Sequence, residues 1–214
     1  MIILGIDPGK AIGFCLYDTA KRRAVISLVC PAEDIEGAVV RLLPHADLVA
    51  IERPRIYQSG GNDIADACEQ FGWLLHRCGG KVTRKDLGGG ASAFGHVAAL
   101  ERRAVTGALS RAMGQQVQGD AGVWRALMQL HGPDADRAPQ AAVTGRPYLP
   151  RIQSVTATKT RAAVQGQREQ TAIAACAEVP AGPLFGVASH ARQALAVAWA
   201  AAEIDAIVLE CLPF

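Results

Sequence analysis

The chain has 214 residues, of which 50% are hydrophobic and 20% are charged. It can therefore bury a substantial core, and its composition excludes an intrinsically disordered or collagen-like protein. Because 22 Lys and Arg residues face 20 Asp and Glu residues, the net charge is only +2, and a polyanionic partner would have to bind a local basic surface.

The first half of the chain alternates between strand and helix patterns. Short apolar or β-branched runs separated by polar turns predict strands, and apolar residues at helical spacing predict the helices between them. The predicted strands cover residues 2–6, 11–17, 24–30, 47–51 and 81–83, and the predicted helices cover residues 32–43 and 62–78. We therefore expect an antiparallel meander followed by a parallel crossover connection.

The second half is predicted to be mostly helical. Residues 88–95 are rich in Gly, Ala and Ser, which suits a flexible lid or an inserted loop. Residues 133–158 are rich in Pro, Gly and Thr without a sustained period, so we expect partial disorder there. The predicted helices cover residues 96–113, 119–131, 159–177 and 189–204.

Two acids, Asp7 and Glu52, each follow an apolar strand pattern at its carboxyl end. If the two strands are neighbours in one sheet, both carboxylates leave the same edge within a few ångströms, which is the geometry that hard cations require. Two Mg²⁺ ions on such carboxylates could activate a water and stabilise the leaving oxygen of a displacement at phosphorus. Alternatively, Asp7 only begins a turn and Glu52 only ends a surface strand. Spacing alone leaves both interpretations open.

Three segments carry a family resemblance: GIDPGKAIGF at 5–14, VAIERP at 49–54 and SHARQALAVAW at 189–199. In order and spacing they resemble the RuvC-type Holliday junction resolvases, particularly the phage-type members, which belong to the RNase H-like superfamily. The resemblance implies an α/β fold with a five-stranded mixed sheet flanked by helices. It also implies one nuclease domain over residues 1–214, with an expanded insertion around 85–180.

The resemblance further implies a homodimer that nicks four-way DNA junctions symmetrically, with two Mg²⁺ or Mn²⁺ ions as cofactors. Asp7 matches the family's first-strand metal ligand, and Glu52 matches the acid of its later central strand. In the final helix the family has an acid or His followed three residues later by Asp, where this chain has His190 and Gln193. An imidazole can ligate either ion or act on the attacking water. The neutral amide of Gln193 is a departure, because it supplies no charge to a cation.

The final helix is expected to present both residues to one site. Ser189 is predicted to cap it, which places His190 in the first turn and Gln193 one turn later on the same face. Without the motif, His190 would be interpreted as a surface histidine. Glu69 and Asp120 are possible replacement acids, although each is typical of a solvated helix residue and neither is assigned as a ligand.

Basic residues flank the two acids and crowd the middle of the chain. Gathered on one face they would bind phosphates with strongly salt-dependent affinity. The candidate DNA-binding residues are Lys10, Arg53, Arg55, Lys81, Arg84, Lys85, Arg102 and Arg103. Alternatively, Arg102 and Arg103 form the exposed side of an amphipathic helix. Tyr57, Phe94 and Trp124 are candidates for stacking on junction bases, although core packing is the commoner use of such residues.

Six cysteines without a CxxC pair indicate buried free thiols and a reducing, cytoplasmic location. Asp7 and Lys10 interrupt the apolar start of the chain, so we expect neither a signal peptide nor a membrane-spanning helix.

Three functions are consistent with these patterns. The favoured one is a metal-dependent, structure-selective endonuclease that resolves four-way DNA junctions through Asp7, Glu52 and His190. The second is a protein of the same fold that binds branched DNA but is catalytically weakened by Gln193. The third is a phosphate-handling enzyme of the actin-like ATPase and sugar-kinase group, which is disfavoured because the chain is short for two lobes and has no second phosphate loop.

Overall fold

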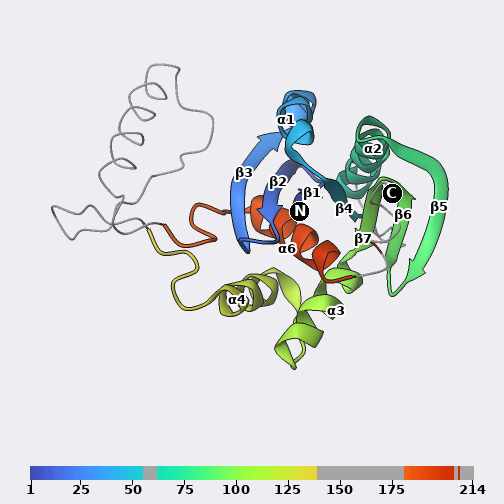
Figure 1. Ribbon diagram of the computed structural model, residues 1–214. Helices are drawn as coiled ribbons and strands as arrows, with labels where there is room; N and C mark the ends of the chain where they lie inside the picture. Colours follow the sequence, from blue (N-terminus) through green and yellow to red (C-terminus); the bar gives the residue numbers. More distant parts are fainter. Residues whose placement is uncertain (55–61, 139–180, 205–206, 208–214) are drawn as a thin grey trace, which may run out of the picture.

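The structure is a computed structural model, and it describes residues 1–54, 62–138, 181–204 and 207. Seven strands form one mixed sheet in the centre of the molecule (Figure 1). They are β1 (Ile2–Asp7), β2 (Ala11–Asp18), β3 (Arg23–Pro31), β4 (Leu48–Arg53), β5 (Gly80–Gly88), β6 (Ala91–Gly95) and β7 (Val97–Glu101). Their order in the sheet is β3-β2-β1-β4-β7-β6-β5.

The order confirms the predicted meander and crossover. Strands β1, β2 and β3 pair antiparallel, and β4 then pairs parallel to β1. Strand β7 adds parallel to β4, which completes a five-stranded mixed sheet. The prediction of five strands is nevertheless wrong for the whole sheet, because the antiparallel strands β6 and β5 extend it by two at the β7 edge.

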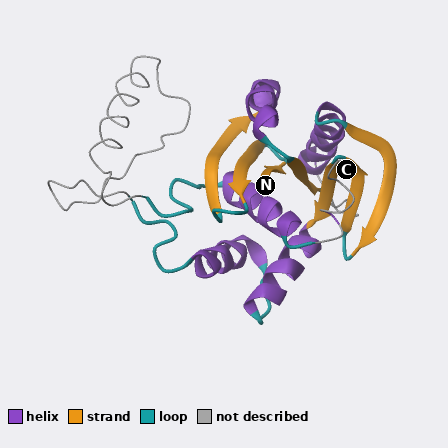
Figure 2. Ribbon diagram, in the orientation of Figure 1, coloured by secondary structure: helices purple, strands orange, loops and turns teal. Residues whose placement is uncertain are grey.

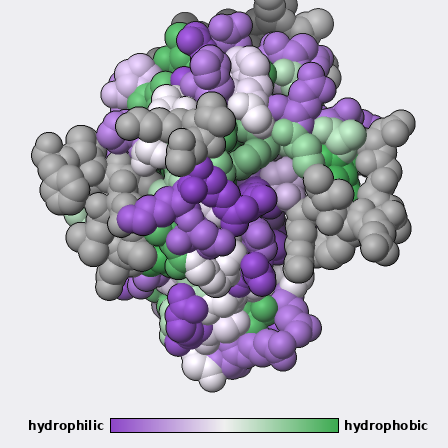
Figure 3. All heavy atoms as spheres, turned by 90° about the vertical axis from the view of Figure 1, so that its right-hand side faces the viewer, coloured by the Kyte–Doolittle hydropathy of each residue, from purple (hydrophilic) through white to green (hydrophobic). Residues whose placement is uncertain are grey.

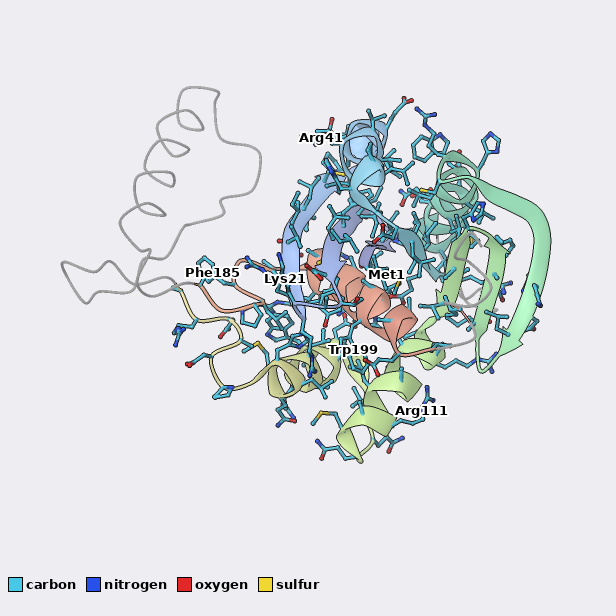
Figure 4. The ribbon with its side chains drawn as sticks, in the orientation of Figure 1. Met1, Lys21, Arg41, Arg111, Phe185 and Trp199 are labelled. Atoms are coloured by element: carbon cyan, nitrogen blue, oxygen red, sulfur yellow. The ribbon has the colours of Figure 1, made fainter. Side chains whose placement is uncertain are left out.

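Helices cover both faces of the sheet (Figure 2). They are α1 (Ile35–Leu42), α2 (Asn62–Arg77), α3 (Arg102–Met113), α4 (Gly119–His131) and α6 (His190–Ala202), with two short 3-10 helices, η1 (Ala32–Asp34) and η2 (Leu43–His45). Helices α1 and α2 share one apolar cluster with one side of the strands, and α6, α3 and α4 share a second cluster with the other side. Trp199 of α6 is buried in the second cluster, where α6 faces α3 (Figure 4).

The prediction of a loop at residues 88–95 and a helix from residue 96 was wrong. Gly88, Gly89 and Gly90 adopt positive φ angles and form a tight turn, after which the small residues of Ala91–Gly95 are buried as a strand. Residues Val97–Leu100 are fully buried in β7, and the helix begins only at Arg102. An apolar run of four residues does not distinguish a buried strand from a buried helix by periodicity.

Other predicted elements match the structure closely, and some lie outside it. The helix predicted over 189–204 is α6, and the helix predicted over 119–131 is α4. The helix predicted over 159–177 and most of the segment 133–158 lie outside the described residues. Cys15, Cys30 and Cys78 are buried free thiols and Cys68 is a half-buried one, while the other two cysteines are not described. None of the helices in the described ranges has the length and apolar character needed to span a membrane.

Two glycines of the first motif allow α6 to lie directly on the sheet. A Cβ atom at Gly5 would overlap the carbonyl oxygen of Ala194, and a Cβ atom at Gly13 would overlap the carbonyl group of His190. The alanines of α6 present little side-chain volume, so the helix backbone approaches β1 and β2 closely. This packing fixes the first turn of α6 above the strand ends where the candidate site lies.

Candidate active site at the carboxyl ends of β1 and β4

Asp7 and Glu52 lie side by side on neighbouring parallel strands. The register pairs Ile6 with Ile51, so each acid is the next residue on its strand. Neighbouring strands are about 4.8 Å apart, and side chains at equivalent positions point to the same face. That face is the one covered by α6, because Gly5 contacts α6 two residues before Asp7. The two strand ends are therefore adjacent, as the sequence predicted.

His190 lies above Asp7 at the start of α6. Its Nδ1 atom is 3.1 Å from Oδ2 of Asp7, and its side chain is 46% exposed, against 14% for Asp7. Ser189 does not cap the helix as predicted: its φ angle is 49°, and its side chain makes no capping hydrogen bond. The His190 ring thus connects a half-buried carboxylate to solvent, which is the placement of a proton-transferring group.

Gln193 also points into the site, where it contacts Arg102 at the start of α3. Nη1 of Arg102 donates to Oε1 of Gln193 at 2.6 Å and to Oε2 of Glu52 at 3.1 Å. Nη2 of the same guanidinium donates to Asp120 of α4. Arg102 therefore joins β4, α4 and α6 and is not a solvated residue on the outer side of a helix; its expected contact with phosphate stays a prediction.

Burial dominates the electrostatics of the two acids. The pKa of Glu52 is raised from 4.5 to about 7, chiefly because the carboxyl is removed from water; the positive charge and hydrogen bond of Arg102 oppose this rise, and the negative charge of Asp7 adds to it. Burial also raises the pKa of Asp7, against the lowering effects of His190 and Arg102. Two half-buried carboxylates beside one guanidinium are short of positive charge.

This donor set fits one divalent cation. Asp7 and Glu52 each commit one oxygen to the contacts above and have a second oxygen for a cation, and carboxylate oxygens are the ligands that Mg²⁺ and Mn²⁺ prefer. The predicted pair of ions stays a prediction. Among the described residues, no three His, Cys, Asp or Glu side chains group closely enough to hold a metal, and Gln193 is engaged by Arg102.

The turn after β1 is held by α2, which packs on the face of the sheet opposite to α6. The backbone N–H of Gly9 donates to Oε1 of Gln70 at 2.9 Å, so α2 fixes the turn that follows Asp7. Lys10 is exposed in this turn. Glu69, the neighbour of Gln70, is also exposed, and nothing among the described contacts brings it to the site.

The other predicted DNA-binding residues fall into two groups. Arg53 and Arg103 are near the site, at the end of β4 and the start of α3, and both pair with Glu101 at 3.9 and 2.8 Å. Arg84 and Lys85 lie on β5 at the sheet edge, three strands from β4 and thus about 14 Å away from it.

Strand β5 forms the right-hand edge of Figure 1, and the corresponding side of the molecule in Figure 3 is hydrophilic at its centre. Arg84 there contacts Ser92 and Asp86. Lys81 also lies on β5, although its side chain is not described, and Arg55 lies outside the described residues. The predicted basic residues therefore do not gather at the acids as one group.

A cleft of about 700 Å³ opens beside the acids, between α4 and α6. It is lined by Asp120, Ala121, Trp124, Arg125, Met128, Ser189, His190, Arg192 and Gln193. The guanidinium carbon of Arg192 lies 4.4 Å from the centre of the Trp124 ring, which is a cation–π distance. The cleft therefore offers positive charge beside His190, held there against the ring of Trp124.

The three aromatic residues singled out from the sequence have different outcomes. Trp124 lines the cleft. Phe94 is buried and packs edge-on against Phe71 of α2, so it belongs to the core rather than to a DNA-binding surface. Tyr57 lies outside the described residues.

Sequence reasoning missed three features of the site. It assigned Arg102 to a surface, set aside Asp120 as a solvated residue, and gave no role to Arg192. All three come together only because α3 and α4 pack against α6. Arg102 follows closely after the apolar run Val97–Leu100. Had this run been predicted as a strand beside β4, Arg102 would have been expected at the same edge of the sheet as Glu52.

Comparison with known proteins gives a distant structural likeness. No protein-family model and no curated protein sequence match the chain. The structure is similar to that of T. thermophilus RuvC in complex with a Holliday junction substrate, with 16% sequence identity, a TM-score of 0.45, and coverage of 97% of this chain and 96% of that chain. It is also similar to a second Thermus thermophilus RuvC structure, with 15% identity, a TM-score of 0.42 and complete coverage of both chains. Likeness at this level does not transfer an activity.

Proposed function

We propose that this chain is a metal-dependent, structure-selective DNA endonuclease of RNase H-like fold that resolves four-way junctions by phosphodiester hydrolysis. The observation that carries the proposal is the adjacency of two half-buried carboxylates, Asp7 and Glu52, next to His190, which lines a cleft. The strand order β3-β2-β1-β4-β7, with β4 and β7 parallel to β1, supports the RNase H-like assignment.

The two carboxylates would hold a Mg²⁺ or Mn²⁺ ion through the oxygens that face away from His190 and Arg102. Such an ion, when bound, lowers the pKa of water and polarises a phosphoryl oxygen. The carboxylates themselves orient the reacting groups, because both project from strands whose register is fixed by the sheet. Partial burial of both carboxylates strengthens the charge interactions within the site.

His190 would move the proton of the attacking water. With Nδ1 donating to Asp7, Nε2 is the ring atom that accepts a proton, and the exposure of the ring gives it access to substrate and solvent. The same contact stabilises the imidazolium that forms after transfer. Asp7 therefore holds the ring in one orientation as well as binding the cation.

The cleft between α4 and α6 would receive the DNA strand to be cut. Arg125 and Arg192 lie in it for contact with phosphates, and the Trp124 ring holds the Arg192 guanidinium there. Because one such site cuts one strand, symmetric nicking of a junction requires two copies, and we propose a homodimer that acts on DNA in the cytoplasm.

The test is cleavage of a synthetic four-way junction by the purified chain, with Mg²⁺ or Mn²⁺ and with EDTA. We expect paired nicks that require the metal and a loss of at least about 100-fold in Asp7→Asn, with junction binding retained. Lys21→Gln, at the turn between β2 and β3, is the matched control and should cut normally. An intact junction in both metals would overturn the proposal.

A second candidate function is branched-DNA binding without cleavage. It is favoured by the contact of Arg102 with both Glu52 and Gln193, which places a fixed positive charge where a second ion would otherwise lie. Gln193→Asp discriminates between the two. If the wild-type protein is inactive and Gln193→Asp cleaves the junction, the result supports branched-DNA binding as the function. Cleavage by the wild-type protein excludes that function.

A further inference from the structure

Arg102 holds a central position in the candidate active site. It is the first residue of α3, immediately after β7, whose register places Leu100 opposite Glu52. Its guanidinium contacts side chains from three different elements: Glu52 on β4, Gln193 on α6 and Asp120 on α4. Figure 1 shows α3 and α4 together beneath α6, so the first turn of α3 lies where these elements meet.

The contacts of Arg102 are those of a cation in a ligand shell. Its three partners are all oxygen acceptors, two of them carboxylates. A guanidinium stays charged at every physiological pH and presents five N–H donors in a rigid plane. The contacts named here use three of those donors, which leaves two for a further oxygen acceptor. The Arg102 side chain is 34% exposed, so part of the guanidinium is open to substrate.

Gln193 is suited to this arrangement. The amide oxygen accepts the short bond from Nη1 and adds no charge. Because Gln193 is only 9% exposed, its amide would be costly to bury without a partner. The guanidinium is that partner. The residue that departs from the family's metal-ligand pattern is therefore matched to an arginine rather than to an ion.

We propose, on the basis of the endonuclease function above, that Arg102 takes the place of a second divalent cation. It binds a non-bridging oxygen of the scissile phosphate and offsets the negative charge that develops there, while Glu52 and Gln193 hold its guanidinium in position. The chain then needs one divalent ion, held by Asp7 and Glu52, and not two.

The first test is Mn²⁺ binding to the full-length protein without DNA, measured by electron paramagnetic resonance and by calorimetry. We expect wild-type protein to bind one Mn²⁺. In Arg102→Gln the carboxylates lose their counter-charge, so Mn²⁺ should bind about tenfold tighter or more. Arg41→Gln, on α1 across the sheet (Figure 4), is the control and should bind as wild type does. Two Mn²⁺ ions in the wild-type site would overturn the inference.

Arg102→Lys is a second variant that keeps the inference testable if Arg102→Gln does not fold, and circular dichroism checks the fold of both. The lysine keeps the charge but loses the planar fork, so we expect Mn²⁺ affinity within about threefold of wild type. An affinity gain as large as that of Arg102→Gln would overturn the inference, because charge would then not be what Arg102 contributes.

The second test is junction cleavage. Removal of one group that stabilises transition-state charge typically lowers the rate about 100-fold to 1,000-fold, and we expect Arg102→Gln to fall in this range while Arg41→Gln cuts normally. Arg102→Gln that cuts at the wild-type rate would overturn the inference. If wild-type protein itself does not cut, the endonuclease function fails instead, and the Mn²⁺ stoichiometry still decides whether Arg102 excludes a second ion.

Discussion

The raised pKa of Glu52 predicts a specific pH dependence of stability in metal-free protein. Glu52 is 16% exposed, and its pKa rises from 4.5 to about 7, chiefly through burial. Between these two values the native state keeps the proton that the unfolded chain has already released. The contribution of protonated Glu52 to the free energy of unfolding is therefore fully present below pH 4.5 and is lost as the pH rises through 7.

The size of this loss follows from the pKa change. Each pH unit between the two pKa values corresponds to about 1.4 kcal/mol, so Glu52 lowers the free energy of unfolding by about 3 kcal/mol between pH 4.5 and pH 8. Glu52→Gln has no such proton to release. Relative to wild type, the variant should thus gain about 3 kcal/mol over the same interval.

The assay is urea unfolding followed by circular dichroism at pH 4.5 and pH 8, in EDTA, for both proteins. Comparison of the two pH values cancels any constant effect of the substitution on packing. Glu33→Gln, at an exposed position of η1, is the control and should track wild type. A wild-type-to-variant difference that changes by less than about 1 kcal/mol between the two pH values would contradict the burial argument.

Addition of Mn²⁺ at pH 8 extends the same experiment. A cation that binds only the native state at 100 times its Kd stabilises it by about 2.7 kcal/mol. We expect this gain in wild-type protein and its loss in Glu52→Gln, because the variant lacks one of the two carboxylates. Equal stabilisation of both proteins would place the cation elsewhere.

Two further predictions concern the elements around the site. Gly13→Ala should destabilise the protein by about 1–3 kcal/mol and slow cleavage, because the added Cβ displaces the backbone at His190. Gly37→Ala is the control: its Cβ meets open space in α1, so the variant should be neutral or stabilising in the same urea titration. Equal behaviour of the two variants would contradict the close approach of α6 to the sheet. Trp124→Ala should weaken binding of a four-way junction about threefold in Ca²⁺, measured by fluorescence anisotropy, because it removes the ring that holds the Arg192 guanidinium in the cleft; unchanged affinity would contradict a part for this pair in DNA binding.

The strand ends that carry Asp7 and Glu52 could be predicted from the sequence, because each acid closes a short apolar run. The helix pattern at 32–43 also implies a parallel crossover from the strand at 24–30 to the strand at 47–51. The pairing of β1 with β4 is a long-range contact, so the adjacency of the two acids was only a condition of the sequence argument. The glycines at 5 and 13 could not be interpreted in this way, because their reason is the backbone of α6, more than 170 residues away in the sequence.

The role of Arg102 could not be predicted, because it depends on an element whose type was misassigned. With residues 96–113 predicted as one helix, Arg102 falls in its middle and looks solvated. Once Val97–Glu101 is a strand next to β4, the same residue emerges beside Glu52. The apolar run alone did not distinguish the two, since all of its side chains are buried and neither period is visible.

The cleft between α4 and α6 also could not be predicted from the sequence, because helix patterns do not show which helices pack together. The sequence predicts a helix over 119–131 and offers Trp124 as a candidate for stacking on bases. Its place opposite Arg192 results from the packing of α4 against α6, which lie far apart in the sequence.

The central claim is that Asp7 and Glu52 share a divalent cation. Anomalous diffraction from a crystal grown with Mn²⁺ and recorded at the manganese edge tests it most directly. We predict one strong peak in contact with both carboxylates. We also expect the hydrogen bond between Arg102 and Gln193 to be retained in that crystal. No peak at these side chains in a crystal saturated with Mn²⁺ would contradict the claim.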